Sequence, residues 1–309
     1  MNRLKQRLFN LCILIIFLMT IALVGCSSHF DDKTFNAQGT ITAFKMDADC
    51  AQVTIKATDG LAKIEYQQNG VFAFSVVEEN GVLYMDSVRD VHFFGGKIPS
   101  VVVYMPTACV LDVNIENGDV VVEQNAFVSF KVETDNGKVT VDGATVAGDL
   151  YLGVDNGEIT LQNSTVADGF LEVEIDNGDI SITNVTASGN VDVDFDNGAL
   201  LVDTLHAQEV VFSADNADFS LKNVTCTDLL IELDNGDVVG QKIDVSNHCR
   251  VELSVGGIYL QLKGKQEDYK ITVDTELGDI NVSDNTNASA KRSFVAITEI
   301  GDINVTFYQ

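Results

Sequence analysis

The sequence predicts an all-β protein, a parallel β-solenoid of about ten coils of roughly 20 residues each. Three observations lead to this fold class. After residue 110, a motif of alternating apolar residues around Asn-Gly recurs about every 20 residues. Within each copy, apolar residues fall at every second position, which is the periodicity of a β-strand. One copy could not bury its apolar side alone, whereas stacked copies bury a continuous core.

The chain begins with a predicted export signal. Arg3, Lys5 and Arg7 form a basic start, and an apolar run of 17 residues follows at 8–24. This arrangement is typical of a secretory signal peptide. The run leads into a Leu-Val-Gly-Cys tetrapeptide that ends at Cys26 and resembles the bacterial lipobox, which implies cleavage before this cysteine and its diacylation. An uncleaved membrane anchor is the alternative, although this run is at the short end for a span.

We therefore expect a signal peptide at residues 1–25 and a lipid-anchored tether at residues 26–35. The membrane, held through the lipid on Cys26, is the first expected partner. The body of the protein would then lie on the extracytoplasmic face of the cell membrane. In a host with two membranes, it would lie in the periplasm or on the outer membrane.

Four cysteines remain in the expected exported body, namely Cys50, Cys109, Cys226 and Cys249. An oxidising compartment permits disulfides, and four cysteines allow three pairings. Buried free thiols that act as small apolar side chains are an equally supported interpretation. The sequence has no Cys-x-x-Cys motif, so it supports neither a zinc site nor a thioredoxin-like site.

Residues 36–110 depart from the regular repeat. Short apolar stretches at 53–56, 64–66, 71–74, 82–85 and 101–105 predict strands, and Asp-Gly or Asn-Gly pairs between them predict turns. Solenoids need atypical ends that prevent edge-to-edge growth. We therefore expect an irregular β section here that caps the solenoid, and no helix after the signal peptide.

The regular repeats fill residues 111–309. Each copy predicts a strand, an Asn-Gly turn, a second short strand, a corner and a third short strand. The turn glycine or its equivalent recurs as Gly118, Gly137, Gly157, Gly178, Gly198, Ala217, Gly236, Gly256, Gly278 and Gly301. Asn-Gly between alternating apolar residues also signals a hairpin, so an up-and-down antiparallel barrel is the alternative. We favour the parallel solenoid because identical residues recur once per repeat.

Two stretches carry a resemblance to a known family. Val101-Val-Val-Tyr-Met-Pro106, followed by Leu111-Asp-Val-Asn-Ile-Glu-Asn-Gly-Asp-Val120, resembles the bacterial β-strand-repeat "putative adhesin" family. That family has no known function and is related in style to head-domain proteins with a Gly-Ile-Asn repeat. The resemblance covers residues 36–309 and implies a β-repeat architecture. The last three copies depart from the pattern, because Val255, Leu277 and Ile300 replace the turn asparagine.

The turn asparagines are predicted to stack into a structural ladder. Asparagine tolerates the left-handed conformation and bonds its own backbone in turns. A glycine would follow because a type I′ turn needs positive φ at both central positions. Ala217 breaks this rule and predicts local strain or a different turn. The ladder comprises Asn117, Asn136, Asn156, Asn177, Asn197, Asn216 and Asn235.

The net charge of −27 is concentrated in the repeats, where residues 111–240 hold 26 acidic against 3 basic residues. Like charges stacked about 4.8 Å apart repel by roughly 1 kcal/mol in water, and Ca²⁺ prefers carboxylate and carbonyl oxygens. Weak Ca²⁺ binding along the turn edge is one hypothesis, and a solvated acidic rim is the alternative. The candidate ligands are Asp135, Asp155, Asp176, Asp179, Asp196, Asp215, Asp218, Asp234 and Asp237.

The same charge excludes nucleic acid as a partner, because phosphate would be repelled. Outward acids four residues before the turn glycine could instead form a face for a basic partner, such as a cationic peptide or polysaccharide. Parallel β-helices also host polysaccharide-cleaving enzymes with paired carboxylates. However, the four histidines are scattered, and no Gly-x-Ser-x-Gly motif or P-loop occurs.

The sequence thus favours a non-catalytic, lipid-anchored protein of the cell envelope, with the solenoid as a binding or spacing rod of adhesin type. We expect no cofactor apart from the weak Ca²⁺ hypothesis. The partner beyond the membrane, protein or glycan, is not identified. A carbohydrate-active β-helix enzyme and an accessory partner of an envelope-stress sensor are the alternatives.

Overall fold

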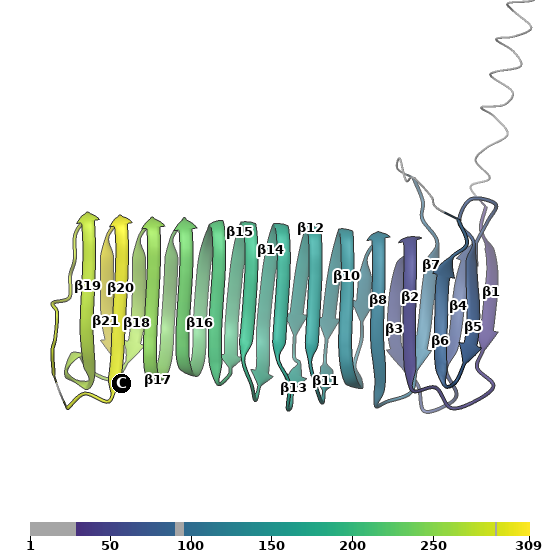
Figure 1. The fold of residues 1–309 in the computed structure, drawn as a ribbon, viewed down its shortest axis with the longest axis horizontal. Coiled ribbons are helices and arrows are strands. Elements are labelled where there is room, and N and C mark those ends of the chain that lie inside the picture. The colour runs from purple at the N-terminus through teal and green to yellow at the C-terminus, as the bar shows by residue number, and fades with distance from the viewer. Residues whose placement is uncertain (1–28, 90–95, 288) are drawn as a thin grey trace, which may run out of the picture.

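The structure is a computed structural model that describes residues 29–89, 96–287 and 289–309, and these residues form a long rod of stacked β-coils (Figure 1). The expected signal peptide and Cys26 lie outside the described residues. Within the described part, 21 strands and one 3-10 turn confirm the predicted parallel β-solenoid. In this part of the chain, no helix is both long and apolar enough to cross a membrane.

The strands are numbered in chain order. The first group comprises β1 (Asp31–Asn36), β2 (Ala43–Cys50), β3 (Gln52–Ala57), β4 (Lys63–Gln68), β5 (Phe74–Glu79), β6 (Val82–Ser87) and β7 (Ser100–Met105). The regular coils comprise β8 (Cys109–Asn117), β9 (Val120–Val122), β10 (Asn125–Asp142), β11 (Ala144–Val146), β12 (Leu150–Gln162), β13 (Thr165–Val166), β14 (Leu171–Ala187), β15 (Val191–His206), β16 (Glu209–Asn235), β17 (Val238–Val255) and β18 (Ile258–Lys263). The last group comprises η1 (Gln266–Asp268), β19 (Tyr269–Leu277), β20 (Arg292–Ile300) and β21 (Ile303–Tyr308).

Each regular coil has three sides, which β14 illustrates. Residues 171–177 lie along the side that we call face A, residues 180–183 along face B, and residues 185–187 along the short face C. Each segment pairs in parallel with the same segment of β15, so that Asn177 lies opposite Asn197. This register is the predicted three-strand coil, and it rules out the antiparallel barrel.

Side chains that alternate with the exposed ones fill the interior of the rod. In β14, Val173, Ile175, Ile180, Ile182 and Val185 are at most 2% exposed. Burial of one such aliphatic side chain contributes about 1.5–3 kcal/mol. Because the equivalent positions of neighbouring coils are also apolar, the interior forms one core cluster along the rod.

The corner between face A and face B requires glycine because neighbouring coils approach closely there. A Cβ on Gly178 would lie 1.7 Å from the carbonyl oxygen of Gly157 in the preceding coil. The φ of Gly178 is +150°, a value that L side chains rarely adopt. Ala217 occupies the same column opposite Gly198 without a positive φ, so the backbone takes a different conformation at this corner.

The predicted type I′ turn is wrong. Among the described residues with positive φ, none is one of the seven ladder asparagines. Each ladder asparagine is in extended backbone, and the chain turns a corner of the coil instead of reversing into a hairpin. The same dipeptide suits both geometries, because both need a glycine at the second position.

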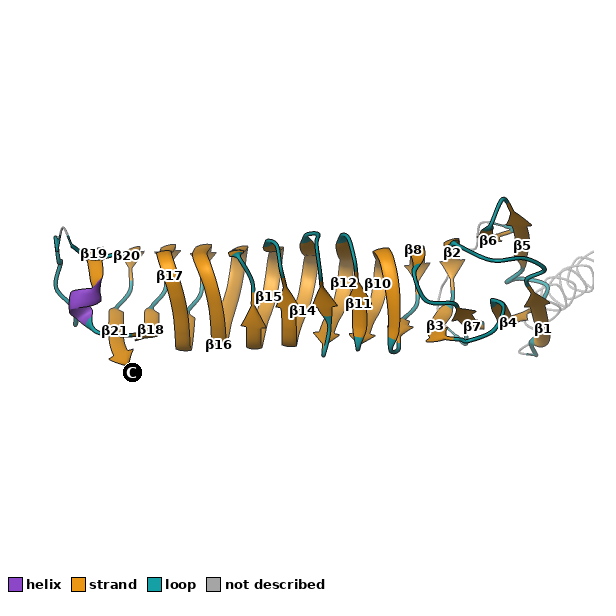
Figure 2. Cartoon of the chain, turned by 90° about the horizontal axis from the view of Figure 1, so that it is seen from below, coloured by secondary structure: helices purple, strands orange, loops and turns teal. Residues whose placement is uncertain are grey.

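The N-terminal end stacks its coils in an order that differs from the chain order (Figure 2). β2 and β3 lie in parallel against β8 and β9, and β6 and β7 lie beyond them. β4 and β5 add antiparallel strands to β7 and β6, and β1 adds another to β4. The section before residue 110 therefore holds two parallel coils under an antiparallel cap. Its strand β5 begins at Phe74, where the segment expected at 71–74 ends.

The C-terminal end also departs from the chain order. β20 lies between β17 and β19, and β21 continues the same coil next to β18 (Figure 1). The copy around Gly301 therefore stacks directly on the coil of Gly256, and the copy around Gly278 lies outermost. At the C-terminal end the later strand β20 thus lies inside the earlier strand β19, whereas at the N-terminal end the earlier strand β2 lies inside the later strand β6.

Candidate functional site

Face A presents three outward columns of side chains, at the positions six, four and two residues before the corner glycine. In β14 and β15 all six of these positions are exposed carboxylates. We call them the acidic patch, and they are Glu172, Glu174, Asp176, Asp192, Asp194 and Asp196. Glu172 lies in register with Asp192, and Glu174 with Asp194. None of the six forms an ion pair within the described part of the chain.

Crowding in the acidic patch disfavours its charged form. Partial burial is the largest cause that raises the pKa of Glu172, and repulsion from Glu174 and Asp192 adds to it. Partial burial also comes first in raising the pKa of Asp192 and of Asp194, and neighbouring carboxylates add to both shifts. A cation placed between these coils would relieve the repulsion.

A hollow adjoins the acidic patch on its N-terminal side. Gly153 stands in the outward column between Glu133 and Glu174, and it lines a hollow with a volume of about 270 Å³. Tyr151 forms one wall, and its hydroxyl donates a hydrogen bond of 2.5 Å to Glu174 Oε2. Burial and this carboxylate raise the pKa of Tyr151. Lys131 lies 5.2 Å from the centre of the Tyr151 ring and pairs with Glu133 at 2.9 Å.

The seven ladder asparagines lie in one column at the corner of face A. Each side-chain amide after Asn117 donates to the amide oxygen of the preceding asparagine, at donor–acceptor distances of 3.1–3.5 Å. Asn117 itself donates to the carbonyl oxygen of Asp49 in β2 at 3.3 Å. The structure thus brings all seven predicted ladder residues together in a continuous chain of amides.

The acids that follow the corner glycine have a structural role. Asp179 accepts a hydrogen bond from the backbone N–H of Ala199, one coil further, at 3.0 Å. Asp218 and Asp237 accept equivalent bonds from the following coils at 3.0 and 2.7 Å. These three candidate Ca²⁺ ligands therefore already satisfy backbone donors of the neighbouring coil.

All nine candidate Ca²⁺ ligands are exposed along the corner of the rod. Asp135, Asp155, Asp176, Asp196, Asp215 and Asp234 form the column two residues before the corner glycine. Across residues 29–89, 96–287 and 289–309, no group of three or more His, Cys, Asp or Glu side chains is arranged to hold a metal ion. Calcium binding along this edge stays a prediction, which a Ca²⁺ titration of the melting temperature against Na⁺ at equal ionic strength tests.

The four cysteines of the body are buried and carry free thiols. Burial raises the pKa of Cys50 to about 11 and that of Cys226 to about 12. It also raises the pKa of Cys109 and Cys249. A buried thiol with a raised pKa has little thiolate and reacts slowly, so these side chains act as small core residues.

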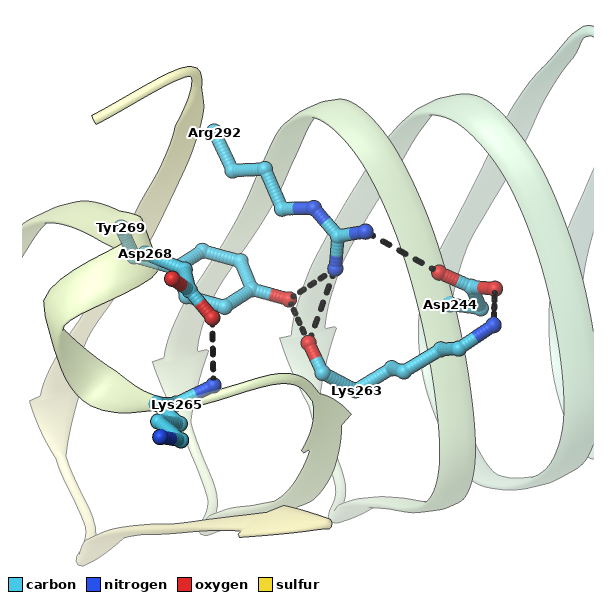
Figure 3. A network of polar contacts seen from close by, with 6 residues as sticks. All are labelled: Asp244, Lys263, Lys265, Asp268, Tyr269 and Arg292. Atoms are coloured by element: carbon cyan, nitrogen blue, oxygen red, sulfur yellow. Dashed lines mark hydrogen bonds and ion pairs between the residues drawn. The ribbon is translucent and has the colours of Figure 1, made fainter. Parts of the chain in front are cut away.

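A second polar cluster lies at the C-terminal end (Figure 3). Asp244 accepts from Lys263 Nζ at 2.5 Å and lies 3.6 Å from the guanidinium of Arg292. Arg292 also donates to the hydroxyl of Tyr269 and to the carbonyl oxygen of Lys263, at 3.1 and 2.8 Å. Tyr269 donates to the same carbonyl oxygen at 2.6 Å. The cluster ties together β17, β18, β19 and β20 beside an open hollow of about 770 Å³.

The sequence does not predict the hollow or the C-terminal cluster. The signal for the hollow was a glycine at an outward position, Gly153, where the two neighbouring copies carry Glu133 and Glu174. The signal for the cluster was the concentration of basic residues in the long loops around 263–270 and 284–292. Neither pattern specifies which side chains meet, because Asp244 and Arg292 come from coils far apart in the chain.

Several solved structures are similar to this chain at low sequence identity. A "putative adhesin" from Bacteroides fragilis is 12% identical, with 90% of this chain and 98% of that chain covered and a TM-score of 0.37. A "putative lipid binding protein" from Parabacteroides distasonis is 8% identical, with 92% and 98% covered and a TM-score of 0.48. A "putative adhesin" from Parabacteroides merdae is 11% identical, with 92% and 98% covered and a TM-score of 0.35. No curated protein matches the chain.

The profile described as Toastrack DUF4097 matches residues 41–194 and again residues 186–306. The two matches together span nearly all the stacked coils, from β2 to β21, including the two reordered ends. The chain therefore belongs to the Toastrack DUF4097 family.

Proposed function

We propose that this protein is a non-catalytic, lipid-anchored binding rod of the cell envelope, and that the acidic patch on face A receives a polycationic ligand. The supporting observation is the patch itself, because six exposed carboxylates lie in two adjacent coils and none of them forms an ion pair with the residues that the structure describes. A cationic peptide or a cationic polysaccharide has the matching charge. Complementary charge of this kind raises association rates and selects partners.

Energetics favours a multivalent cation over a single ion at this surface. The carboxylates are exposed, so each single contact with a cation contributes little in water. Two coils nevertheless present carboxylates in rows about 4.8 Å apart, so an extended polycation could contact several of them at once. The binding free energies of contacts within one polycation add together, because the polycation loses its translational freedom only once.

Calorimetry with an oligolysine peptide and a chitosan oligosaccharide tests this proposal. The patch variant carries Glu172→Gln, Glu174→Gln, Asp192→Asn and Asp194→Asn. The control variant removes the same charge from exposed acids elsewhere, through Asp59→Asn, Glu79→Gln, Asp168→Asn and Glu267→Gln. At low salt, we expect about tenfold weaker binding for the patch variant and less than twofold for the control. Equal weakening in both variants would mean that only net charge matters and would refute the proposal.

The lipid anchor is tested separately through Cys26. We expect the wild-type chain expressed in bacteria to incorporate an alkyne-labelled palmitate and to sediment with membranes. The variant Cys26→Ser should incorporate no label and should leave the membrane fraction. Labelling that persists in the variant would place the lipid elsewhere and overturn this part of the proposal.

A further inference from the structure

The corner column that holds the asparagine ladder changes character at the C-terminal end. In the last three coils, the ladder position is occupied by Val255, Ile300 and Leu277, which are 42%, 49% and 67% exposed. Val255 lies in register with Ile300, and Ile300 with Leu277. We call these three contiguous aliphatic side chains the tip column. Ile280, on the outermost coil, is a further exposed aliphatic residue at 39%.

The coil does not need aliphatic side chains at these positions. Gly256 and Gly301 keep the corner conformation of the middle coils, with φ of +143° and +154°. Leu277 is exposed, as six of the seven ladder asparagines are, and therefore adds little to the core. At the N-terminal end the same column holds Cys50, which is 1% exposed. Apolar residues in this column are thus buried at one end of the rod and open to solvent at the other.

Carboxylates border the tip column on both sides. Glu299 and Glu276 precede Ile300 and Leu277 on face A, and all four side chains are exposed. On the face B side, Asp302 and Asp279 follow the corner glycines and are exposed as well. In the part of the chain that the structure describes, Glu276 and Glu299 form no ion pair.

The acidic border of the tip column favours a basic partner segment over a second copy of the chain. If a second copy of the chain met the tip column with its own, acidic borders would face each other, and like charges would oppose the contact. A segment with aliphatic side chains flanked by lysine or arginine would bury the apolar column and pair with the border. Small clusters of buried apolar residues ringed by polar contacts are the usual centre of such interfaces.

We propose that the tip column is a docking site for a partner segment that presents aliphatic side chains flanked by basic ones. The site lies at the end of the rod opposite β1, and therefore at the end farthest from any N-terminal anchor (Figure 1). It uses residues outside the acidic patch and does not depend on the function proposed for face A. A partner could thus be held at the free end of the rod.

The test compares two fluorescent peptides of about 12 residues, long enough to cross several coils. One alternates leucine with lysine, and the other alternates serine with lysine, so that both carry the same charge. The variant Val255→Asn, Ile300→Asn and Leu277→Asn restores the residue of the middle coils and therefore suits the fold. We expect the wild type to bind the Leu-Lys peptide about tenfold more tightly than the Ser-Lys peptide. The variant should show no such preference.

Two further measurements keep the test decisive. The variant Glu276→Gln with Glu299→Gln leaves the aliphatic column intact and should weaken binding of the Leu-Lys peptide severalfold. The acidic patch variant should keep the preference for leucine, which separates this site from face A. An unchanged preference in the triple asparagine variant would overturn the proposal. Self-association of the wild type that is absent from the triple asparagine variant, as measured by sedimentation, would also overturn the proposal. The occupant of the tip column would then be a second copy of the chain.

Discussion

The corner column of the rod is polar in the middle coils and aliphatic at the C-terminal end. From Asn117 to Asn235 the amides bond to one another at 3.1–3.5 Å, whereas Val255, Ile300 and Leu277 make no such bonds. The backbone follows the same corner in both regions, with a φ of +150° at Gly178 and +154° at Gly301. The glycine and the close stacking therefore set the geometry. The preceding residue adds stability in one region and is free to serve another purpose in the other.

The largest expected effect comes from removing a corner glycine. In Gly178→Ala, the new Cβ would lie 1.7 Å from the carbonyl oxygen of Gly157, which is backbone and cannot turn aside. We expect a loss of more than about 3 kcal/mol in the free energy of unfolding, because the coils must separate locally. Urea unfolding followed by circular dichroism measures the loss.

Gly70→Ala is the matched control for this change. Gly70 lies in an exposed turn, and a Cβ there meets nothing within 4 Å. The free energy of unfolding of the Gly70→Ala variant should stay within about 0.5 kcal/mol of that of the wild type. A similarly small effect in Gly178→Ala would show that the glycine does not determine the backbone geometry of the corner. The middle and C-terminal coils could then not be said to share a corner imposed by glycine.

The periodic part of the fold could be predicted from the sequence, because each copy repeats the same alternation around the same dipeptide. The stacking order at the ends could not. The copies around Gly278 and Gly301 carry equivalent motifs, so either could follow Gly256, and long-range contacts decide. The departures in the sequence were the longer spacings of 22 and 23 residues and the loops that lengthen there.

The candidate surfaces likewise include features that could be predicted from the sequence and features that could not. The columns of acids and asparagines follow from the repeat, since equal positions in equal coils must stack. The type I′ turn was wrong because Asn-Gly is compatible with an extended asparagine before a corner glycine. The hollow beside Tyr151 lies where Gly153 interrupts the outward column of acids between Glu133 and Glu174. The contacts of Asp244 depend on how the end coils interleave, and no periodic pattern encodes either feature.

The second-largest effect is expected at the C-terminal cluster. Asp244→Ala removes the acceptor of Lys263 and the partner of Arg292, and the Asp244 side chain is only 18% exposed. We expect a loss of about 1–2 kcal/mol in the free energy of unfolding, because two cations lose their partner in a partly buried site. Hydrogen exchange should place the loss of protection in β18 to β21.

Asp112→Ala provides the control at the other end of the regular coils. Asp112 pairs with Lys45 at 3.0 Å, but its side chain is 39% exposed. Exposed pairs contribute about 0–1 kcal/mol, so this change should cost less than the one at Asp244. Equal costs would indicate that the C-terminal cluster is an ordinary surface pair and not a tie between the reordered coils.

The third prediction exchanges the residues of the two regions. Asn177→Val removes the amide bonds with Asn156 and Asn197 and should cost about 1 kcal/mol. Val255→Asn places an amide next to Asn235 and should be neutral or stabilise by up to about 1 kcal/mol. Thermal and urea unfolding of both variants measure these two changes in the free energy of unfolding. A cost for Val255→Asn as large as that for Asn177→Val would mean that the aliphatic residue stabilises the end coil, which would argue against a docking role.

The smallest effect concerns the pH dependence of the acidic middle region. The pKa values of Glu172, Asp192 and Asp194 are raised, mainly by partial burial and further by repulsion. A raised pKa means that the folded state binds a proton more readily than the unfolded state does. Ionisation of these groups therefore destabilises the fold at neutral pH. That destabilisation is lost as the pH falls through their raised values towards about 4.

We therefore expect the free energy of unfolding, measured in urea, to rise slightly from pH 7 to pH 5, by less than about 1 kcal/mol because the groups are exposed. The variant Glu172→Gln with Asp192→Asn and Asp194→Asn should be more stable than the wild type at pH 7 and should lose most of this rise. Polycations should mimic the effect of acid on the wild type, since both relieve the same repulsion. A rise of equal size in the variant would locate the titrating groups outside the acidic patch and would remove the energetic basis for cation binding there.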